Sequence, residues 1–225
     1  MRPRRLVVVV GTGTGVGKTW VSARVLTTLR AAGVTVAARK PAQSFDTDSE
    51  GRTLGGATDA EVLGKASGED PGVVCPSYRS YHRAMAPPMA AEALGLAGFT
   101  VRELVDELSW PAEGVQVGFV ETAGGVRSPQ ASDGDACDLL RALVPDAVVL
   151  VSDAGLGTIN EVRLSMGALA TVIAEIPEVP VVVVLDRFDP RHEIHQRNRQ
   201  WLAERDGYQV VTLPGEESVL ADLVI

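Results

Sequence analysis

The sequence predicts an α/β fold, in which a doubly wound and mainly parallel sheet carries helices on both faces. Continuous apolar runs recur at residues 6–10, 115–120, 147–152 and 179–185, and such runs are typical of parallel strands that are covered on both sides. Segments with helical signals alternate with these runs, as in a βαβ protein. A glycine-rich segment joins the first strand to the first helix, where phosphate-binding loops occur.

Local signals mark where the helices begin and end. Gly33 follows the first helical segment, and glycine readily adopts the left-handed conformation that ends a helix. Thr58 caps the second helical segment, and Thr100 forms a capping box with Glu103 before the third. The expected order is a strand at 6–10, a helix at 19–32, a strand at 34–39, a polar loop to residue 58, helices at 59–66 and 100–108, strands at 115–120 and 147–152, a helix at 156–174, a strand at 179–185, a polar helix from about residue 191, and a strand at 208–213. No repeat or linker interrupts this order, so we expect one nucleotide-binding domain over residues 1–225.

The composition narrows the class of protein. The chain has 225 residues and a net charge of −8, which argues against a nucleic-acid partner because such proteins need a basic face. No apolar run approaches the ~20 residues of a membrane span, so we expect no membrane partner. Arg5 leads directly into the strand before the glycine-rich segment, and a cleaved signal peptide would remove that segment, so we expect a cytoplasmic protein. Cys75 and Cys137 are too far apart in sequence to indicate a metal site.

The glycine-rich segment has the residues that a phosphate-binding loop needs, which makes the predicted fold P-loop NTPase-like. Glycines allow backbone N–H groups to turn towards phosphate oxygens, and the following helix adds partial positive charge. Lys18 can reach the terminal phosphates, and the Thr19 hydroxyl can bind the accompanying Mg²⁺. The standard spacing has a glycine at position 12, whereas the glycine here is Gly11, so the loop is one residue longer. The expected nucleotide-binding residues of the loop are Gly13, Thr14, Gly15, Val16, Gly17, Lys18 and Thr19.

A dinucleotide-binding turn is the neighbouring alternative. That turn requires a third glycine where this chain has Val16, and an acidic residue at the end of the second strand. The second strand instead ends at Arg39 and Lys40. A glycine-rich turn that binds no nucleotide remains as the other alternative.

Charged residues follow the predicted strands at the edge where ligands bind in open α/β sheets. The chain has 18 arginines but only three lysines, so a lysine at that edge indicates a need for a compact charge. Lys18 and Lys40 both lie there. Thr19, Asp59 and Glu121 offer the oxygen ligands that Mg²⁺ prefers. Alternatively, Glu121 caps a neighbouring helix, and Asp59 is an ordinary residue at a helix start.

Several motifs together resemble those of dethiobiotin synthetases. They are the loop sequence GTGTGVGKT, Lys40-Pro41, Thr58-Asp59-Ala60, Met85-Ala86-Pro87, Glu121 with Ala123-Gly124-Gly125, and Leu156-Gly157-Thr158-Ile159-Asn160. Their order and spacing match from about residue 6 to residue 169. The resemblance implies an ATP-dependent ligase that joins CO₂ to 7,8-diaminopelargonic acid and closes a ureido ring in biotin synthesis. It also implies a carbamate, a carbamic–phosphoric anhydride, Mg²⁺ and a homodimer.

The resemblance assigns a role to each candidate residue. Lys40, Lys18 and Thr14 would act on the reacting groups, and Ser44, Gly124 and Gly125 would hold the substrate or phosphate. Asn160 would meet the substrate's tail near the dimer interface. Asp186 and Pro214 would lie at the nucleotide base, beside Glu121 and the loop. Asp186 stands where the family has an asparagine that contacts adenine. A carboxylate only accepts hydrogen bonds, so it could accept from the amino group of adenine but would meet adenine N7 unfavourably. We therefore expect weak selectivity among ATP and other nucleoside triphosphates.

Two further departures from the family pattern concern the substrate site. Thr122 replaces a glycine, which would place a branched side chain near the phosphate path, and Phe45 replaces a glycine after Ser44, which would reshape the diamine site. These departures leave open a related ligase or kinase that acts on another amine or carboxylate. A dimerising nucleotide-switch ATPase is a further alternative, although Gly13 stands where those proteins carry a signature lysine. Arg187 and the arginines after it are expected to form ion pairs at the surface.

Overall fold

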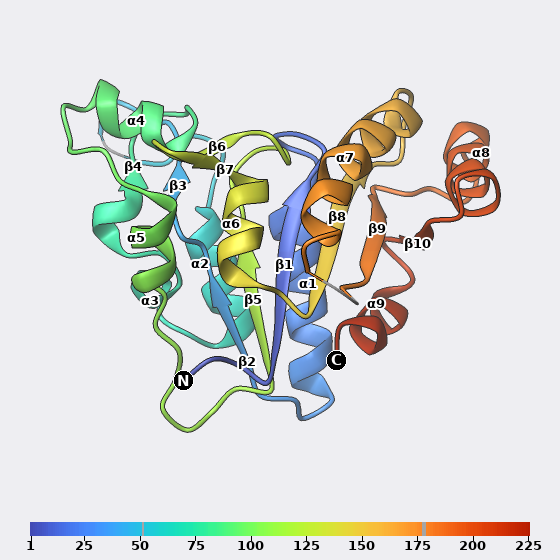
Figure 1. The fold of residues 1–225 in the computed structure, drawn as a ribbon, viewed down its shortest axis with the longest axis horizontal. Coiled ribbons are helices and arrows are strands. Elements are labelled where there is room, and N and C mark those ends of the chain that lie inside the picture. The colour runs from blue at the N-terminus through green and yellow to red at the C-terminus, as the bar shows by residue number, and fades with distance from the viewer. Residues whose placement is uncertain (51, 177–178) are drawn as a thin grey trace.

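The computed structural model describes residues 1–50, 52–176 and 179–225. Its centre is a six-stranded sheet in which every neighbouring pair is parallel. Across the sheet the strands are β10 (Gln209–Thr212), β9 (Val181–Asp186), β8 (Ala147–Asp153), β1 (Arg5–Gly11), β5 (Val117–Glu121) and β2 (Val36–Arg39). Each apolar run predicted as a strand is a strand of this sheet, and the predicted doubly wound α/β class is confirmed (Figure 1).

Helices cover both faces because alternate residues of each buried strand point to opposite sides. In β1, Val7 and Val9 belong to one buried cluster, whereas Val8 and Val10 belong to the other. The first cluster includes side chains of α1 (Lys18–Ala31), α2 (Asp59–Ser67), α3 (Pro71–Val74) and α9 (Glu217–Val224). The second includes side chains of α4 (Pro87–Ala93), α5 (Val101–Asp106), α6 (Ala136–Leu143), α7 (Thr158–Ile173) and the π-helical η2 (Trp201–Arg205), which continues α8 (Glu193–Gln200).

The structure adds elements that the sequence pattern did not predict. Helices α3, α4, α6 and α9 are short, and the 3₁₀ turn η1 (Ser77–Arg79) is shorter still. Two small sheets pair β3 (Gln43–Ser44) with β4 (Ser80–Tyr81) and β6 (Pro129–Ala131) with β7 (Gly134–Asp135). Gly51, in the expected polar loop, lies outside the described residues. Within the described parts of the chain, no helix combines the length and apolarity needed to cross a membrane.

Candidate active site

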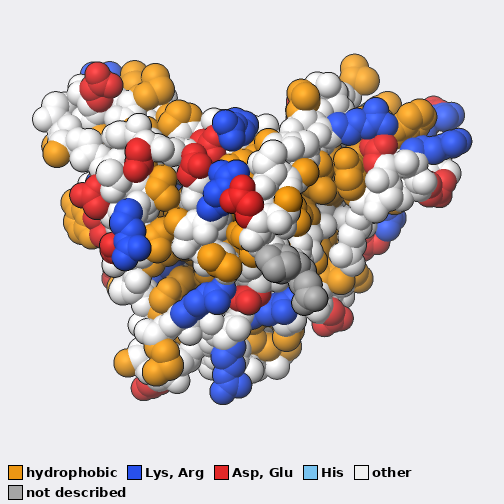
Figure 2. All heavy atoms as spheres, viewed as in Figure 1, with side chains coloured by type: hydrophobic (Ala, Val, Ile, Leu, Met, Phe, Trp, Pro, Cys, Tyr) orange, Lys and Arg blue, Asp and Glu red, His pale blue; other side chains and the backbone are white. Residues whose placement is uncertain are grey.

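The order of the strands brings the predicted site residues together. β5 pairs with β1 on one side and with β2 on the other. Glu121 ends β5, so it lies between the phosphate loop that follows β1 and Lys40, which follows β2. The carboxyl edge of the sheet, uppermost in Figure 1, is also where the surface is hollowed in Figure 2.

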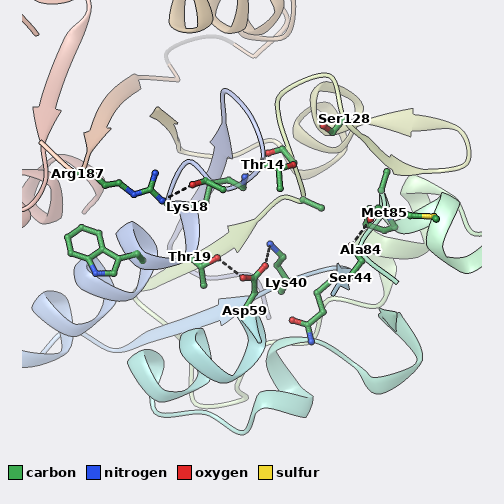
Figure 3. A pocket seen from close by; sticks show the side chains of 18 residues that line it. Thr14, Lys18, Thr19, Lys40, Ser44, Asp59, Ala84, Met85, Ser128 and Arg187 are labelled. Carbon is green, nitrogen blue, oxygen red and sulfur yellow. Dashed lines mark hydrogen bonds and ion pairs between the residues drawn. The ribbon is translucent and has the colours of Figure 1, made fainter. Parts of the chain in front are cut away.

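A cavity of about 650 Å³ opens at this edge. Lys18, Thr19 and Lys40 lie towards its middle, with Arg187 at one end and Ser44 and Met85 at the other (Figure 3). Its walls are Thr14, Gly15, Gly17, Lys18, Thr19, Trp20, Lys40, Gln43, Ser44, Asp59, Ala84, Met85, Ala86, Pro87, Ala123, Gly124, Ser128 and Arg187. The cavity therefore joins the phosphate loop to the segments after β2 and β5, which lie far apart in sequence.

The side chain of Lys18 folds back onto the phosphate loop. Gly17 has a φ of 95° before α1, a conformation that glycine adopts without steric cost. Lys18 Nζ donates to the carbonyl oxygens of Gly13, at 3.0 Å, and Gly124, at 2.7 Å. Burial, together with the positive charge of Lys40, lowers the pKa of Lys18 to about 8. The loop thus holds a buried lysine whose charge an anionic phosphate would stabilise.

Lys40 is almost fully buried and lies between two carboxylates. Its Nζ is 2.8 Å from Glu121 Oε1 and 2.7 Å from Asp59 Oδ2, and it donates to the Thr122 carbonyl at 3.2 Å. Burial alone would lower the pKa of Lys40, but Glu121 and Asp59 outweigh burial and raise it above its ordinary value. Lys40 in turn lowers the pKa of Asp59, against the opposing effect of burial. Lys40 and Asp59 are therefore charged at neutral pH.

The oxygen atoms around Thr19 fit a magnesium ion. Thr19 Oγ1 lies 2.8 Å from Asp59 Oδ1 and 2.8 Å from Glu121 Oε1, yet a hydroxyl has only one proton to donate. Lys40 shares its ammonium group between these two carboxylates, so their oxygens retain acceptor capacity. Hydroxyl and carboxylate oxygens, completed by water and phosphate, are the ligands that Mg²⁺ prefers. The donor set of Thr19, Asp59 and Glu121 therefore suits this ion.

The glycine pair after β5 lies at the same edge. Gly124 lines the cavity with a φ of 65°, whereas the Gly125 N–H donates to Ser128 Oγ at 2.8 Å. Thr122 does not extend into the phosphate path, so that expectation is wrong. Its side chain is fully buried, and its Oγ1 donates to the Val9 carbonyl at 3.3 Å. A β-branched residue fits here because this position extends the buried face of the sheet.

The other end of the cavity is formed by the segments around Ser44 and Met85. Ser44 Oγ donates to the Met85 carbonyl at 2.5 Å, and both residues line the wall (Figure 3). Phe45 is not among the lining residues and instead packs against His82, with 5.0 Å between ring centroids. The expectation that Phe45 reshapes the substrate site therefore finds no support, since Met85 provides the apolar surface.

Neither residue expected at the nucleotide base, Asp186 or Pro214, lines the cavity. Asp186, which ends β9, is 3% exposed and is packed so closely that a Cβ on Gly17 would lie 1.9 Å from its Oδ2. Burial raises the pKa of Asp186. Arg187 lines the cavity instead, although it also pairs with Asp153 at 3.0 Å as a surface arginine would. Pro214 follows β10, is exposed, and is not a lining residue.

The remaining predicted residues lie in the loop and on α7. Thr14 and Gly15 line the cavity, whereas the Val16 side chain is buried in the core beneath the loop. Asn160 lies in the first turn of α7, exposed and away from this cavity. Leu156, which precedes α7, is 92% exposed, and Leu164, one turn after Asn160 on α7, is 68% exposed.

Sequence reasoning missed two buried side chains that support the carboxylates. Ser22 donates to Glu121 Oε2 at 2.9 Å, and its place one turn after Thr19 is a signal that could have found it. Gln43 Oε1 accepts the Ala60 N–H at 3.0 Å, which fixes the start of α2 beside Asp59. No local pattern identifies Gln43, because its partner is 17 residues away.

Solved structures of P-loop proteins share this fold. A plasmid partition protein from Borrelia burgdorferi superposes with a TM-score of 0.56 at 12% identity, covering 99% of this chain and 98% of that one. Chloroplast FtsY from Physcomitrella patens gives a TM-score of 0.51 at 18% identity, covering 100% of this chain and 66% of that one. At these identities the likeness shows the fold alone.

Sequence comparison identifies the family. A family model described as an AAA domain matches residues 5–217. The chain is 35% identical over 184 residues to the ATP-dependent dethiobiotin synthetase BioD of Rhodococcus jostii, covering 78% of this chain and 75% of that protein. The BioD proteins of Anaeromyxobacter dehalogenans and Haloferax mediterranei are 36% and 32% identical, covering 82% and 92% of this chain and 78% and 82% of theirs. With this likeness over most of its length, the chain belongs to the dethiobiotin synthetase family.

Proposed function

We propose that the protein is an ATP-dependent dethiobiotin synthetase that converts 7,8-diaminopelargonic acid and CO₂ to dethiobiotin. The observation that carries this proposal is the meeting of two buried lysines, Lys18 and Lys40, in one cavity of about 650 Å³. Thr19 lines the same cavity, and Glu121 contacts both Thr19 and Lys40. A phosphate loop alone needs only the first lysine. The second lysine can bind a further anion, the carbamate, next to the γ-phosphate, as a ligase requires.

The reaction would proceed in three steps that balance. One substrate amine attacks CO₂ and loses a proton, which gives a carbamate. A carbamate oxygen attacks the γ-phosphorus, the bond to the β-phosphate breaks, and ADP leaves a carbamic–phosphoric anhydride. The second amine then attacks the carbonyl carbon, loses a proton and expels phosphate as the ring closes. No protein nucleophile is needed, so positioning and charge stabilisation carry the catalysis.

The residues of the cavity match these needs. Lys18 would hold the terminal phosphates, and Lys40 would stabilise the carbamate as it meets the γ-phosphorus. The backbone of Gly124, with Thr14 across the loop, would contact the transferred phosphoryl group. Ser44 and the apolar Met85 would hold the amines and the carbon chain. Because Lys18 and Lys40 are buried, their charges act in a poorly hydrated part of the site, where they are most effective.

Thr19, Asp59 and Glu121 would hold Mg²⁺ together with water and the phosphates. When bound there, the ion supplies positive charge that offsets the charge of the β- and γ-phosphates. Ser22 would keep the Glu121 carboxylate in place, since its hydrogen bond leaves Oε1 directed towards Thr19. Gln43 would do the same for Asp59 by fixing the backbone at the start of α2.

We also propose a cytoplasmic homodimer in which residues 1–225 act as one unit. Leu156, just before α7, and Leu164, one turn after Asn160 on α7, are exposed and offer an apolar surface to a second copy. Asn160 would then face the partner's cavity and meet the substrate's tail. Leu164→Glu should convert the dimer to monomers in light scattering and weaken diamine binding, whereas a variant that stays dimeric with unchanged KM would contradict this assembly.

The test of the reaction is direct. The protein is incubated with diaminopelargonic acid, bicarbonate, ATP and Mg²⁺, and dethiobiotin, ADP and phosphate are quantified. Labelled bicarbonate should appear in the ureido carbon of the product. ATP turnover with a different acceptor and no dethiobiotin would favour a related ligase or kinase instead. Lys40→Met is the matched negative control, since it leaves the phosphate loop unchanged.

A further inference from the structure

The cavity has two ends, and the reactive groups lie between them. In Figure 3, Arg187 is at one end, Ser44 and Met85 are at the other, and Lys18, Thr19 and Lys40 lie between. A triphosphate in the loop with its γ-phosphate towards Lys40 must direct its nucleoside away from the Ser44 end. The nucleoside therefore leaves the loop at the end where Arg187 lies.

Trp20 lines the same cavity and directly follows the loop residue Thr19. Its side chain is 41% exposed, so the ring is open to the cavity and is not enclosed in the core. The Arg24 guanidinium lies over one face of the ring, 5.6 Å from its centroid. Glu217 of α9 in turn holds Arg24 through Nε at 3.1 Å and Nη2 at 2.7 Å. Trp20 thus offers a supported aromatic surface to the cavity.

Arg187 is held in place as firmly. It has a φ of 56°, a conformation that non-glycine residues adopt rarely and that often marks functional sites. Its guanidinium donates to the Gly15 carbonyl at 2.8 Å and to Asp153 Oδ2 at 3.0 Å. These contacts fix a planar cation over the phosphate loop. A fixed guanidinium plane is a surface on which a nucleobase stacks.

Asp186, which was expected to contact the edge of the base, does not line the cavity. Asp186 is buried against Gly17 and is not among the lining residues, so its carboxylate does not face the cavity. What the nucleoside end offers is a ring and a guanidinium plane. Stacking accepts any base, because every base has a π-face.

We propose that Trp20 and Arg187 form the base-binding end of the site and hold the nucleobase by its faces, so that purine and pyrimidine triphosphates bind alike. This inference rests on the proposed nucleotide-dependent function and names the residues that set its nucleotide preference. The Trp20 ring and the guanidinium plane of Arg187, which its hydrogen bond to the Gly15 carbonyl fixes, are the two stacking surfaces.

Binding measurements test the inference without the reaction. A non-hydrolysable ATP analogue, CTP, GTP and inorganic tripolyphosphate are titrated by calorimetry into the wild type and into Trp20→Ala, Trp20→Phe and Trp201→Phe. Trp20→Ala should weaken all three nucleotides by roughly tenfold, the effect of losing one base–aromatic stack. Its affinity for tripolyphosphate should stay unchanged. Trp20→Phe should keep most of the affinity, and nucleotides should quench wild-type tryptophan fluorescence but not that of Trp20→Phe.

Trp201 is the matched control, because it is also exposed but lies in η2 beside Arg163, outside the cavity. Trp201→Phe should bind every ligand like the wild type. Unchanged nucleotide affinity in Trp20→Ala, an equal loss for tripolyphosphate, or a strong preference for one base would overturn the inference. A wild type that binds nucleotides but makes no dethiobiotin overturns only the proposed reaction, and one that binds no nucleotide overturns both.

Discussion

Replacement of Lys40 by methionine separates the catalytic role of this lysine from its structural one. The side chain of Lys40 is 3% exposed and that of Glu121 is 1% exposed. Methionine fills a similar volume but removes the charge, so Glu121 and Asp59 lose their cationic partner. We expect the variant to fold with reduced stability and to lose nearly all ligase activity.

The size of each effect follows from the geometry. Removal of one partner from a buried ion pair costs about 3–5 kcal/mol, because the other charge stays buried without compensation. For a chain of 225 residues this corresponds to a fall in Tm of roughly 6–20 °C. Loss of one group that stabilises a developing anion lowers kcat by roughly 10²–10³-fold.

A second substitution tests the cause of the instability. In Lys40→Met/Glu121→Gln the buried carboxylate is neutral, while the side chain can still accept from Ser22. This double variant should recover at least half of the lost stability, yet it should remain inactive. Lys65→Met is the matched control, since Lys65 is exposed on α2, and its effect should stay within about 0.5 kcal/mol.

Thermal unfolding and initial rates are measured for the four proteins at constant pH. The pH must keep the ion pairs charged. The lowered pKa of Asp59 makes its contribution present above the unfolded value of about 3.9, and the contribution is lost as pH falls through the folded pKa. The raised pKa of Lys40 makes its contribution present below about 10.4, and it is lost only as pH rises through the folded pKa. At pH 7, a Lys40→Met variant with wild-type Tm, or a double variant less stable than the single one, would refute this reasoning.

Three further predictions concern the phosphate loop and the wall beside it. Because the pKa of Lys18 is lowered to about 8 and a bound phosphate favours the charged form, nucleotide binding above that pH should take up a proton. Calorimetry in buffers of different ionisation enthalpy should detect this uptake, and Lys18→Met should abolish it. Thr19→Ala should raise the Mg²⁺ concentration needed for half-maximal rate by at least roughly tenfold, while Thr19→Ser, which keeps the hydroxyl, should behave like the wild type; equal Mg²⁺ dependence in both variants would argue against the hydroxyl as a ligand. Thr122→Gly should lower stability by about 1–2 kcal/mol, because a buried side chain is lost, but should leave the diamine KM unchanged; a changed KM would return Thr122 to the substrate site.

Much of the fold could be predicted because the strands are covered on both faces. A strand such as β8, Ala147–Asp153, is apolar along nearly its whole length. Such a run can be recognised in the sequence without knowing which strands lie beside it. Helix α6 was missed because its capping box pairs Asp135 with Asp138 rather than a hydroxyl residue with glutamate. The strand pairs β3–β4 and β6–β7 were missed because two or three residues carry no periodicity.

The site was predictable where its residues follow strands, and less so where side-chain direction decides. Lys40 and Glu121 could be placed at one edge from the fold rule alone. The sequence offers no means to tell that the Thr122 side chain turns into the core, or that Asp186 packs on Gly17 while Arg187 faces the cavity. Two adjacent residues at a strand end point in different directions: Arg187, with a left-handed backbone, lines the cavity, whereas Asp186 does not.

The group of Lys40, Asp59 and Glu121 is difficult to explain as a stabilising feature. Buried ion pairs lose much of their attraction to the cost of removing charges from water, and apolar residues of similar volume often stabilise a protein more. Here Lys40 lies 2.7–2.8 Å from both Asp59 and Glu121, and Lys18 is close enough for its pKa to respond to all three groups. Such a group is retained where charge is needed in a poorly hydrated cavity, which is what a site that joins two anions requires. The burial that makes this cluster a costly support for the fold also places two ammonium groups beside carboxylate oxygens, an arrangement that suits a phosphate and a cation. The stability of this edge of the sheet therefore depends on the same residues as its proposed chemistry.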